Sequence, residues 1–475
     1  MNDASHHNGL AAHEARVADE LDHLGLPPKP WLPACAGPDG AEMLDVLVVG
    51  AGMCGIAAAA ALRFKGIHRV RVLDQSAGGR EGPWVTTARM RTLRSPKHLP
   101  GIALGVPGLT FRAYYTARFG SLAWDALYKI GNGDWQDYLS WVAGVLRLPV
   151  SSRTAAIRVL ARGPHLAVEL ADGGTLHARR VVLATGRAAL GGWSIPAGID
   201  LALWPDRAAH TGEHIDIANL VGRRVAVVGA GASGWDAAGA ALEAGASRVD
   251  MHCRRAVLPQ VNKGRGSTNP GYHEGWTGLS AARRWSLLTY LHDVQGPPPH
   301  ESVLRCTAHP NFRLHLASPV RSATRTAEGL VLDVRDGPAE ADFLICATGY
   351  RVDLAAAPLL SPLAPQIATW ADVYTPPPAE HRPALGGFPF LAEDFAATER
   401  FPGRCAALSH LHLFSHAAMA SLGAIASDIP GVSTAAERLS SRIAASLFAE
   451  DFTAIRAALE AFAEPELEST PFFAL

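Results

Sequence analysis

The chain has 475 residues, of which 48% are hydrophobic and 18% charged, and its formal net charge is −1 at pH 7. These values fit a globular protein of about two to four domains, with no general attraction to nucleic acid or an anionic membrane. The six cysteines form no C-x-x-C pair, which argues against a dithiol centre, and no apolar run approaches the ~18 residues of a membrane helix. We therefore expect a cytoplasmic enzyme.

The N-terminal segment, residues 1–42, is predicted to be a helix with an extension. Residues 1–8 are polar and are expected to be frayed. Val17, Leu21 and Leu24 recur at helical spacing, which predicts an amphipathic helix from about Leu10 to Leu24. The proline-rich stretch that follows is typical of an irregular connection.

Two glycine-rich units then dominate the chain. An apolar strand at 44–49 runs into GAGMCG and an alanine-rich helix, and the same design returns at 223–253. A shift of 179 positions superposes the two units without a gap, placing Gly50, Gly52 and Gly55 on Gly229, Gly231 and Gly234. One such motif is weak evidence, but two in register, each between a strand and a small-residue helix, indicate two dinucleotide sites.

The first unit predicts a site for FAD or NAD. Its glycines permit a tight turn, approach of a pyrophosphate and close packing of helix on strand. Asp74 stands 19 residues after Gly55, where its carboxylate can accept both hydrogen bonds of a ribose diol. The predicted cofactor-binding residues of this unit are Gly50, Gly52, Cys54, Gly55, Asp74 and Gln75.

The second unit lacks that carboxylate. Cys253 occupies the equivalent position, and Arg254 and Arg255 follow it directly. Guanidinium groups bind a 2′-phosphate through charge-assisted hydrogen bonds, whereas a carboxylate would repel it. This pattern predicts NADPH, with Gly229, Gly231, Ser233, Gly234, Arg254 and Arg255 as its binding residues.

A related strand-turn follows each unit, VVLATG at 181–186 and FLICATG at 343–349. This order predicts an α/β fold with two Rossmann-like dinucleotide-binding domains, in which an FAD domain is interrupted by an NADPH domain. We assign the FAD domain to 43–205, the NADPH domain to 206–340, and the FAD-domain return with C-terminal helices to 341–475. The two turns place Thr185, Gly186, Thr348 and Gly349 among the predicted cofactor contacts.

This arrangement resembles the class B flavoprotein monooxygenases, which include flavin-containing, N-hydroxylating and Baeyer–Villiger enzymes. Further segments carry the resemblance: GGREGPW at 78–84, ARMRTLRSPKHL at 88–99, GLTFRAYY at 108–115, CATGY at 346–350 and a small-residue stretch at 409–431. The resemblance implies that Trp84, Met90 and Arg91 lie near the flavin. It also implies that 88–99 forms a strand and turn beneath the flavin ring, and that 409–431 forms a closing helix.

The resemblance further implies an enzyme that uses FAD, NADPH and O2 to insert one oxygen atom into a small organic substrate through a C4a-(hydro)peroxyflavin. N- or S-oxygenation is favoured, since 88–115 resembles the N-hydroxylases. Baeyer–Villiger oxidation is the alternative. The stretch WPDRAAHTGEH at 204–214 retains the histidine of that group's fingerprint, His210, which keeps this alternative open, but it lacks the other fingerprint residues. Arg94, Lys97 and His210 are the candidates for tuning the site.

Other interpretations stay open at this stage. The aromatic runs at 111–141 and 271–291 fit either a substrate cavity or ordinary core. A flavin disulfide reductase shares the design but needs a cysteine pair, and a non-catalytic flavoprotein is disfavoured by the intact motifs. The spacing of His410, His412 and His416 suits no metal, and we predict none. A homo-oligomer is compatible with the sequence.

Overall fold

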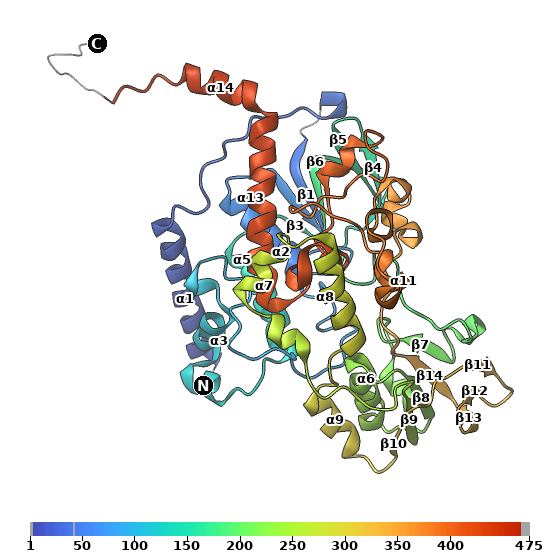
Figure 1. The fold of residues 1–475 in the computed structure, drawn as a ribbon. Coiled ribbons are helices and arrows are strands. Elements are labelled where there is room, and N and C mark those ends of the chain that lie inside the picture. The colour runs from blue at the N-terminus through green and yellow to red at the C-terminus, as the bar shows by residue number, and fades with distance from the viewer. Residues whose placement is uncertain (1–2, 41–42, 467–475) are drawn as a thin grey trace.

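The computed structural model describes residues 3–40 and 43–466 and contains two parallel-stranded domains (Figure 1). The first domain holds a seven-stranded sheet in the order β3-β2-β1-β6-β5-β4, with β15 beside β6. All its pairings are parallel except those of β4 and β5. Its strands are β1 Leu44–Val49, β2 Val70–Leu73, β3 Val150–Ser151, β4 Ala156–Arg162, β5 His165–Leu170, β6 Thr175–Leu183 and β15 Leu411–His412.

The second domain holds a five-stranded parallel sheet in the order β10-β9-β8-β14-β7. Its strands are β7 Ala208–His210, β8 Arg224–Val228, β9 Arg248–His252, β10 Phe312–His315 and β14 Phe343–Cys346. The predicted boundary at 340/341 is therefore too early, because β14 pairs with β8 and β7 before the chain returns to the first domain. A small antiparallel sheet of β11 Ser322–Arg325, β12 Leu330–Val334 and β13 Gly337–Ala341 precedes it.

The two units repeat in three dimensions as they do in sequence. Helix α2, Met53–Phe64, follows β1, and helix α6, Ala232–Glu243, follows β8; the 179-residue shift maps one helix onto the other from end to end. In each domain the strand of the ATG turn lies beside the first strand of the glycine unit, as β6 beside β1 and β14 beside β8. The buried alanines of α2 let it pack closely on its sheet.

Two further groups of helices pack around these sheets. The first group, α3 Phe111–Phe119, α4 Ser121–Ala126 and α5 Asn132–Val145, encloses the aromatic run at 111–141. Phe111, Tyr114, Trp135 and Tyr138 are buried there with ring centroids 5.1 to 6.3 Å apart in the contacting pairs, so this run is core.

The second group leaves the second domain and packs on the first. It consists of α7 Pro270–Gly275 and α8 Ala281–Val294, and it meets the short helices α10 Trp370–Val373, α11 Pro383–Gly386 and α12 Met419–Leu422. Helix α9, His300–Thr307, follows α8 along the chain but packs on α6 within the second domain. Trp285 of α8 and Trp370 of α10 are buried against each other with centroids 5.8 Å apart. The run at 271–291 therefore joins the domains.

The terminal helices differ in part from expectation. Helix α1 spans Asp3–His23 and so begins earlier than predicted. The helical pattern at 433–466 is confirmed as α13 Val432–Glu450 and α14 Phe452–Ala461. The closing helix expected over 409–431 is wrong: this segment is β15, α12 and several single turns, because Gly423 adopts φ 76° and Pro430 interrupts the chain.

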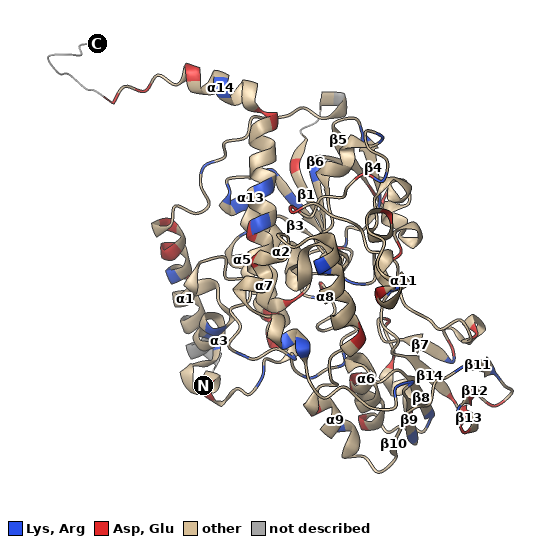
Figure 2. Cartoon of the chain, viewed as in Figure 1, with Lys and Arg blue, Asp and Glu red and all other residues tan. Residues whose placement is uncertain are grey.

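Basic and acidic residues are nearly balanced, with 43 of Lys and Arg against 44 of Asp and Glu. Figure 2 shows acidic and basic residues interspersed along the ribbon in this view. Across residues 3–40 and 43–466, no helix is long and apolar enough to cross a membrane.

Candidate active site

The first glycine turn lies at the carboxyl end of β1. Gly50 adopts φ 103°, a conformation that L side chains rarely adopt. A Cβ on Gly55 would lie 1.7 Å from the carbonyl oxygen of Gly50, so only glycine allows the first turn of α2 to pack there. The buried Asp74 carboxylate accepts hydrogen bonds from the Ala51 and Ser76 amides, both at 2.8 Å, which holds it at the end of β2.

This turn fits an adenine dinucleotide. A Cβ on Gly52 would meet nothing closer than Gly82 at 3.8 Å, so the open approach that a pyrophosphate needs is present. The buried Thr185 hydroxyl beside the turn has no hydrogen-bond partner within the described chain, which suits a polar ligand. Each Asp74 oxygen keeps a second lone pair for a ribose hydroxyl, and Gln75 follows it at the surface.

Other residues predicted near the flavin surround this turn or the core behind it. Gly82, two residues before Trp84, faces Gly52 across the turn, and the Trp84 ring meets Trp135 edge-on at 6.1 Å. The carbonyl oxygen of Met90 accepts a hydrogen bond from Asn132. Burial raises the pKa of the Cys54 thiol to about 12, so Cys54 is a packing residue and not a thiolate.

The second glycine turn reproduces the first. Gly229 adopts φ 104°, and a Cβ on Gly234 would lie 2.2 Å from the Gly229 carbonyl oxygen. A Cβ on Gly231 would meet nothing within 4 Å. The turn opens into a cavity of about 1280 Å³, and the predicted residues that line it are Arg94, Gly229, Gly231, Ser233, Arg254, Arg255, Thr348 and Gly349.

The arginine pair lies at the rim of this cavity. Arg254 is exposed, and Arg255 is half-buried and donates a hydrogen bond to the carbonyl oxygen of Asp293. Asp250, the nearest carboxylate on β9, is occupied by Arg248 at 2.6 Å and His315 at 2.9 Å. Asp250 therefore does not take the ribose-binding place that Cys253 leaves vacant.

The segment 88–99 joins the two domains instead of forming the expected strand. Its only described pairing is an isolated bridge between Thr92 and Gly131. Arg89 donates hydrogen bonds to the carbonyl oxygens of Thr211 and Glu213, at 2.8 and 2.7 Å. Arg91 pairs with Glu243 at 2.7 Å, in the last turn of α6 and away from the glycine turn, so its predicted flavin contact is not supported.

Arg94, in the same segment, reaches the cavity. Its guanidinium pairs at 3.0 Å with the buried carboxylate of Asp236 on α6, which also accepts a hydrogen bond from Ser302 at 2.5 Å. Half of the Arg94 side chain stays exposed to the cavity. Arg94 is thus held in place by the second domain while it faces the site.

The other two tuning candidates lie outside the cavity wall. The Lys97 ammonium donates to the carbonyl oxygens of Trp124 and Asp125 near the end of α4, at 2.7 and 3.2 Å. These bonds explain Lys97 without a catalytic role. His210 is fully buried between the rings of Trp193 and Tyr350, at 5.7 and 5.5 Å, and burial lowers its pKa, so it is a neutral packing residue.

Sequence reasoning missed several polar residues of the cavity, among them Arg187 and His416. Arg187 directly follows the first ATG turn, and this position was the signal that could have identified it. Arg187 forms no salt bridge in the part of the chain that the structure describes, and the Asp428 carboxylate interacts with it from beyond salt-bridge distance, whereas Arg94 pairs directly with Asp236. Burial, together with Arg187, lowers the pKa of His416 to about 3, so the cavity presents a neutral imidazole beside a cation.

Histidines do not assemble into a metal centre here. Within residues 3–40 and 43–466, no group of three His, Cys, Asp or Glu side chains is arranged to hold an ion. His412 instead lies in β15 with Nδ1 2.8 Å from the carbonyl oxygen of Asp394.

Comparisons with known proteins agree with this geometry. A family model described as pyridine nucleotide-disulphide oxidoreductase matches residues 47–270. The FAD-dependent urate hydroxylase of Xanthomonas campestris pv. campestris is 39% identical over 445 residues, covering 93% of this chain and 94% of that protein.

Solved structures of N-hydroxylating enzymes share the fold. An ornithine hydroxylase from Pseudomonas aeruginosa superposes with a TM-score of 0.66 at 19% identity, covering 85% of this chain and 100% of that chain. An ornithine N-hydroxylase from Kutzneria, whose structure has reduced FAD, NADP⁺ and L-ornithine, gives 0.67 at 17% identity, covering 85% and 99%.

Proposed function

The chain belongs to the FAD-dependent monooxygenase family of the urate hydroxylase, and from this premise we propose that it hydroxylates a small, planar, anionic molecule of the urate type with NADPH and O2. The observation that carries the proposal is Arg187, which forms no salt bridge among the described residues and lies in the cavity that also holds the second glycine turn. Each turnover would consume one NADPH, one proton, one O2 and one substrate and release hydroxylated product, NADP⁺ and water.

Each of the two glycine turns would bind one cofactor. The first turn and Asp74 would hold FAD, and the second turn with Arg254 and Arg255 would hold NADPH. When bound, NADPH supplies a hydride and the flavin supplies oxygen activation. The contribution of the protein is to orient both ligands and to keep water from the cavity through the walls formed by α7 and α8.

The charge pattern favours an anionic substrate. Arg94 is paired with Asp236, so its charge is largely satisfied, while Arg187 makes no salt bridge among the described residues and has Asp428 only beyond salt-bridge distance, so its donors would serve a ligand. A planar fork of donors matches an ionised heterocyclic edge, with two parallel hydrogen bonds from one guanidinium. His416, neutral and with Nδ1 unbonded among the described residues, adds a polar group on the same wall.

The N- or S-oxygenation predicted from sequence stays a prediction, which the product analysis below also tests. Oxidation of a carbonyl substrate has no comparable support. His210, the residue retained from the Baeyer–Villiger fingerprint, is fully buried and faces aromatic rings rather than the cavity.

The direct test follows NADPH, O2 and urate in one reaction with the purified yellow protein. We expect urate to accelerate NADPH consumption and to disappear in equal amount, with one oxygen atom from ¹⁸O2 in the product. NADPH oxidation that yields stoichiometric hydrogen peroxide and leaves urate intact would refute the proposed substrate. Oxygenation of an amine or a sulfide in place of urate would support the N- or S-oxygenation that the sequence predicts.

Cofactor choice gives a second test. Replacing Arg254 and Arg255 with alanine should weaken NADPH binding about tenfold to a hundredfold for each lost charge-assisted bond, and should change NADH binding little. The control is Arg313→Ala, an exposed arginine on β10 that does not line the cavity. Equal losses for both dinucleotides would mean that the pair does not bind the 2′-phosphate.

A further inference from the structure

The segment 88–99 runs along helix α6 toward the second glycine turn. Arg91 pairs with Glu243 in the last turn of α6 at 2.7 Å, and Arg94 pairs with Asp236 at 3.0 Å. Asp236 precedes Glu243 by seven residues, which is about 10 Å along the helix axis. The chain from Arg91 to Arg94 therefore follows α6 from its C-terminal end toward its N-terminal end, where the glycine turn lies.

The Arg94 guanidinium ends close to the first turn of α6. Its partner Asp236 follows Ser233 by three residues, which is about 4.5 Å along the helix axis. Arg94, Gly231 and Ser233 line the same cavity. The free N–H groups at the start of a helix bind the phosphates of a dinucleotide. A pyrophosphate held at this turn would therefore lie within reach of an arginine that is fixed to Asp236.

The guanidinium of Arg94 has donors left for such a ligand. Within the described residues it makes one hydrogen bond, from Nη2 to Asp236, so the N–H groups of Nε and Nη1 stay available. The Arg94 side chain is 48% exposed, whereas the Asp236 side chain is 4% exposed and its other oxygen accepts a hydrogen bond from Ser302 at 2.5 Å. Asp236 thus balances the charge of Arg94 but occupies only one of its nitrogens.

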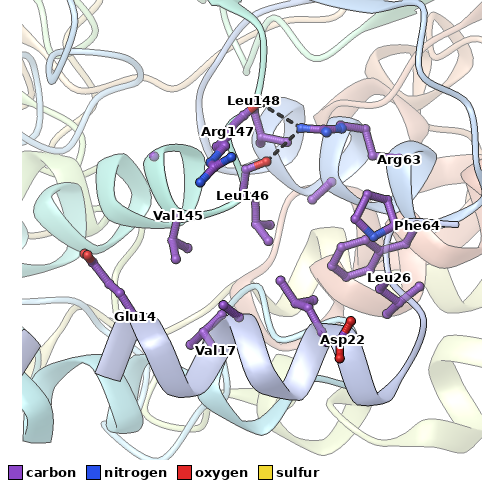
Figure 3. Close-up of a pocket in the computed structure, with 15 residues that line it drawn as sticks. Glu14, Val17, Asp22, Leu26, Arg63, Phe64, Val145, Leu146, Arg147 and Leu148 are labelled. Atoms are coloured by element: carbon purple, nitrogen blue, oxygen red, sulfur yellow. Dashed lines mark hydrogen bonds between the residues drawn. The ribbon is translucent and has the colours of Figure 1, made fainter. Parts of the chain in front are cut away.

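Arg63, which borders another hollow, contrasts with Arg94. This hollow lies between α1 and α2, and Nη1 of Arg63 donates to the carbonyl oxygens of Leu146 and Arg147, both at 2.8 Å, as the dashed lines in Figure 3 show. Neither glycine turn is among the described residues that line this hollow. Of these two arginines, only Arg94 combines available donors with a glycine turn in the same cavity.

We propose that Arg94 binds the pyrophosphate of NADPH and that Asp236 is its positioning residue. The FAD domain thereby supplies a contact to the dinucleotide of the other domain, and Asp236 holds the guanidinium where it completes the anion site at the start of α6. This role rests on the proposed placement of NADPH at the second glycine turn and is independent of the urate-type substrate. It assigns Arg94 to cofactor binding in place of the tuning role expected from sequence.

A pyrophosphate contact differs measurably from the contact proposed for the arginine pair at the cavity rim. Arg254 and Arg255 would bind the 2′-phosphate, which adenosine 2′-monophosphate also carries, whereas this nucleotide has no pyrophosphate. Arg94→Gln should therefore weaken the binding of NADP⁺ roughly tenfold to a hundredfold and leave the binding of adenosine 2′-monophosphate unchanged. Replacing Arg254 and Arg255 with alanine should weaken the binding of both ligands.

Calorimetric titration of the oxidised, FAD-loaded enzyme with NADP⁺ and with adenosine 2′-monophosphate tests the contact. Arg91→Gln is the matched control, because Arg91 lies on the same segment, is 72% exposed and pairs at the far end of α6, so both affinities should stay unchanged. Arg94→Lys should keep part of the NADP⁺ affinity, since lysine retains the charge without the planar fork. Flavin content and circular dichroism verify that each variant folds.

Asp236→Asn tests the positioning role. Asparagine can keep the hydrogen bond from Ser302 but not the ion pair, so we expect a smaller loss of NADP⁺ affinity than Arg94→Gln causes. The combined variant should bind NADP⁺ no more weakly than Arg94→Gln alone, because Asp236 acts through Arg94. A further loss in the combined variant, or tighter binding in Asp236→Asn alone, would overturn the positioning role.

Other results would reject the contact itself. Equal weakening of NADP⁺ and adenosine 2′-monophosphate by Arg94→Gln would mean that this arginine does not bind the pyrophosphate. Unchanged NADP⁺ affinity with a raised KM for urate would place Arg94 with the substrate. Gly231→Ala separates the two levels of failure: if it also leaves NADP⁺ binding intact, the placement of NADPH at the second turn fails, and if it abolishes binding while Arg94→Gln does not, Arg94 alone is rejected.

Discussion

Gly52→Ala should remove bound FAD without unfolding the protein, and Gly231→Ala should remove NADPH binding without loss of flavin. An alanine Cβ has room at both positions, with the nearest atom 3.8 Å away at Gly52 and nothing within 4 Å at Gly231. The Cβ would instead occupy the space through which a pyrophosphate approaches the backbone. We expect each substitution to weaken its own dinucleotide roughly 100-fold or more, about 2.7 kcal/mol.

Flavin absorbance per chain, NADPH titration and thermal unfolding separate these effects. Gly133→Ala on α5 is the matched control, because its Cβ also meets nothing within 4 Å and no ligand is expected there. Gly55→Ala should differ in kind: a Cβ 1.7 Å from the Gly50 carbonyl forces the backbone apart and destabilises the fold itself. If Gly52→Ala keeps its FAD, the first turn does not cradle the pyrophosphate.

The repeat explains why so much of the fold can be predicted. Glycines and small residues occur at fixed spacing because the local backbone requires them, as at Gly50 and Gly229, which adopt φ of 103° and 104°. Such local requirements can be identified in the sequence without knowledge of the surrounding structure. The architecture of two parallel-stranded dinucleotide domains therefore follows from a pattern of a few residues.

The local sequence pattern does not indicate which strands pair when they lie far apart in the chain. β14 shows the same apolar run as any buried strand, and only its hydrogen bonds with β8 and β7 place it in the second sheet. The resemblance implied a closing helix over 409–431, but Gly423 and Pro430 break this segment into short turns that meet α7 and α8.

The candidate site shows the same limit in its arginines. Arg91 and Arg94 have similar surroundings in the sequence, yet one pairs with Glu243 and the other with Asp236, 142 residues beyond it along the chain. Arg187 follows a recognisable turn, but only the assembled cavity shows that it forms no salt bridge among the described residues and that Asp428 stays beyond salt-bridge distance. Whether a carboxylate pairs with an arginine therefore distinguishes an arginine at the domain interface from one available to a substrate, and the sequence alone does not show that pairing.

Arg187→Gln should raise the KM for urate roughly 100-fold while leaving the KM for NADPH unchanged. A bidentate charge-assisted contact to an anion contributes about 1.5–3 kcal/mol per bond, and glutamine keeps the polarity but not the charge. Because the substrate would then sit loosely, reduced enzyme should release more hydrogen peroxide per NADPH consumed. Arg187→Lys should recover part of the affinity, since it restores charge without the planar fork.

Lys97→Gln is the contrasting variant, because its ammonium caps carbonyl oxygens near the end of α4 instead of facing the cavity. It should lower the melting temperature slightly and leave both KM values near those of the wild type. Steady-state kinetics with separate NADPH and urate titrations, plus a peroxide assay, distinguish the possibilities. A rise in the KM for NADPH rather than urate in Arg187→Gln would reassign this arginine to the cofactor. Unchanged constants for both would remove it from the site, and the anionic substrate would lose its structural basis.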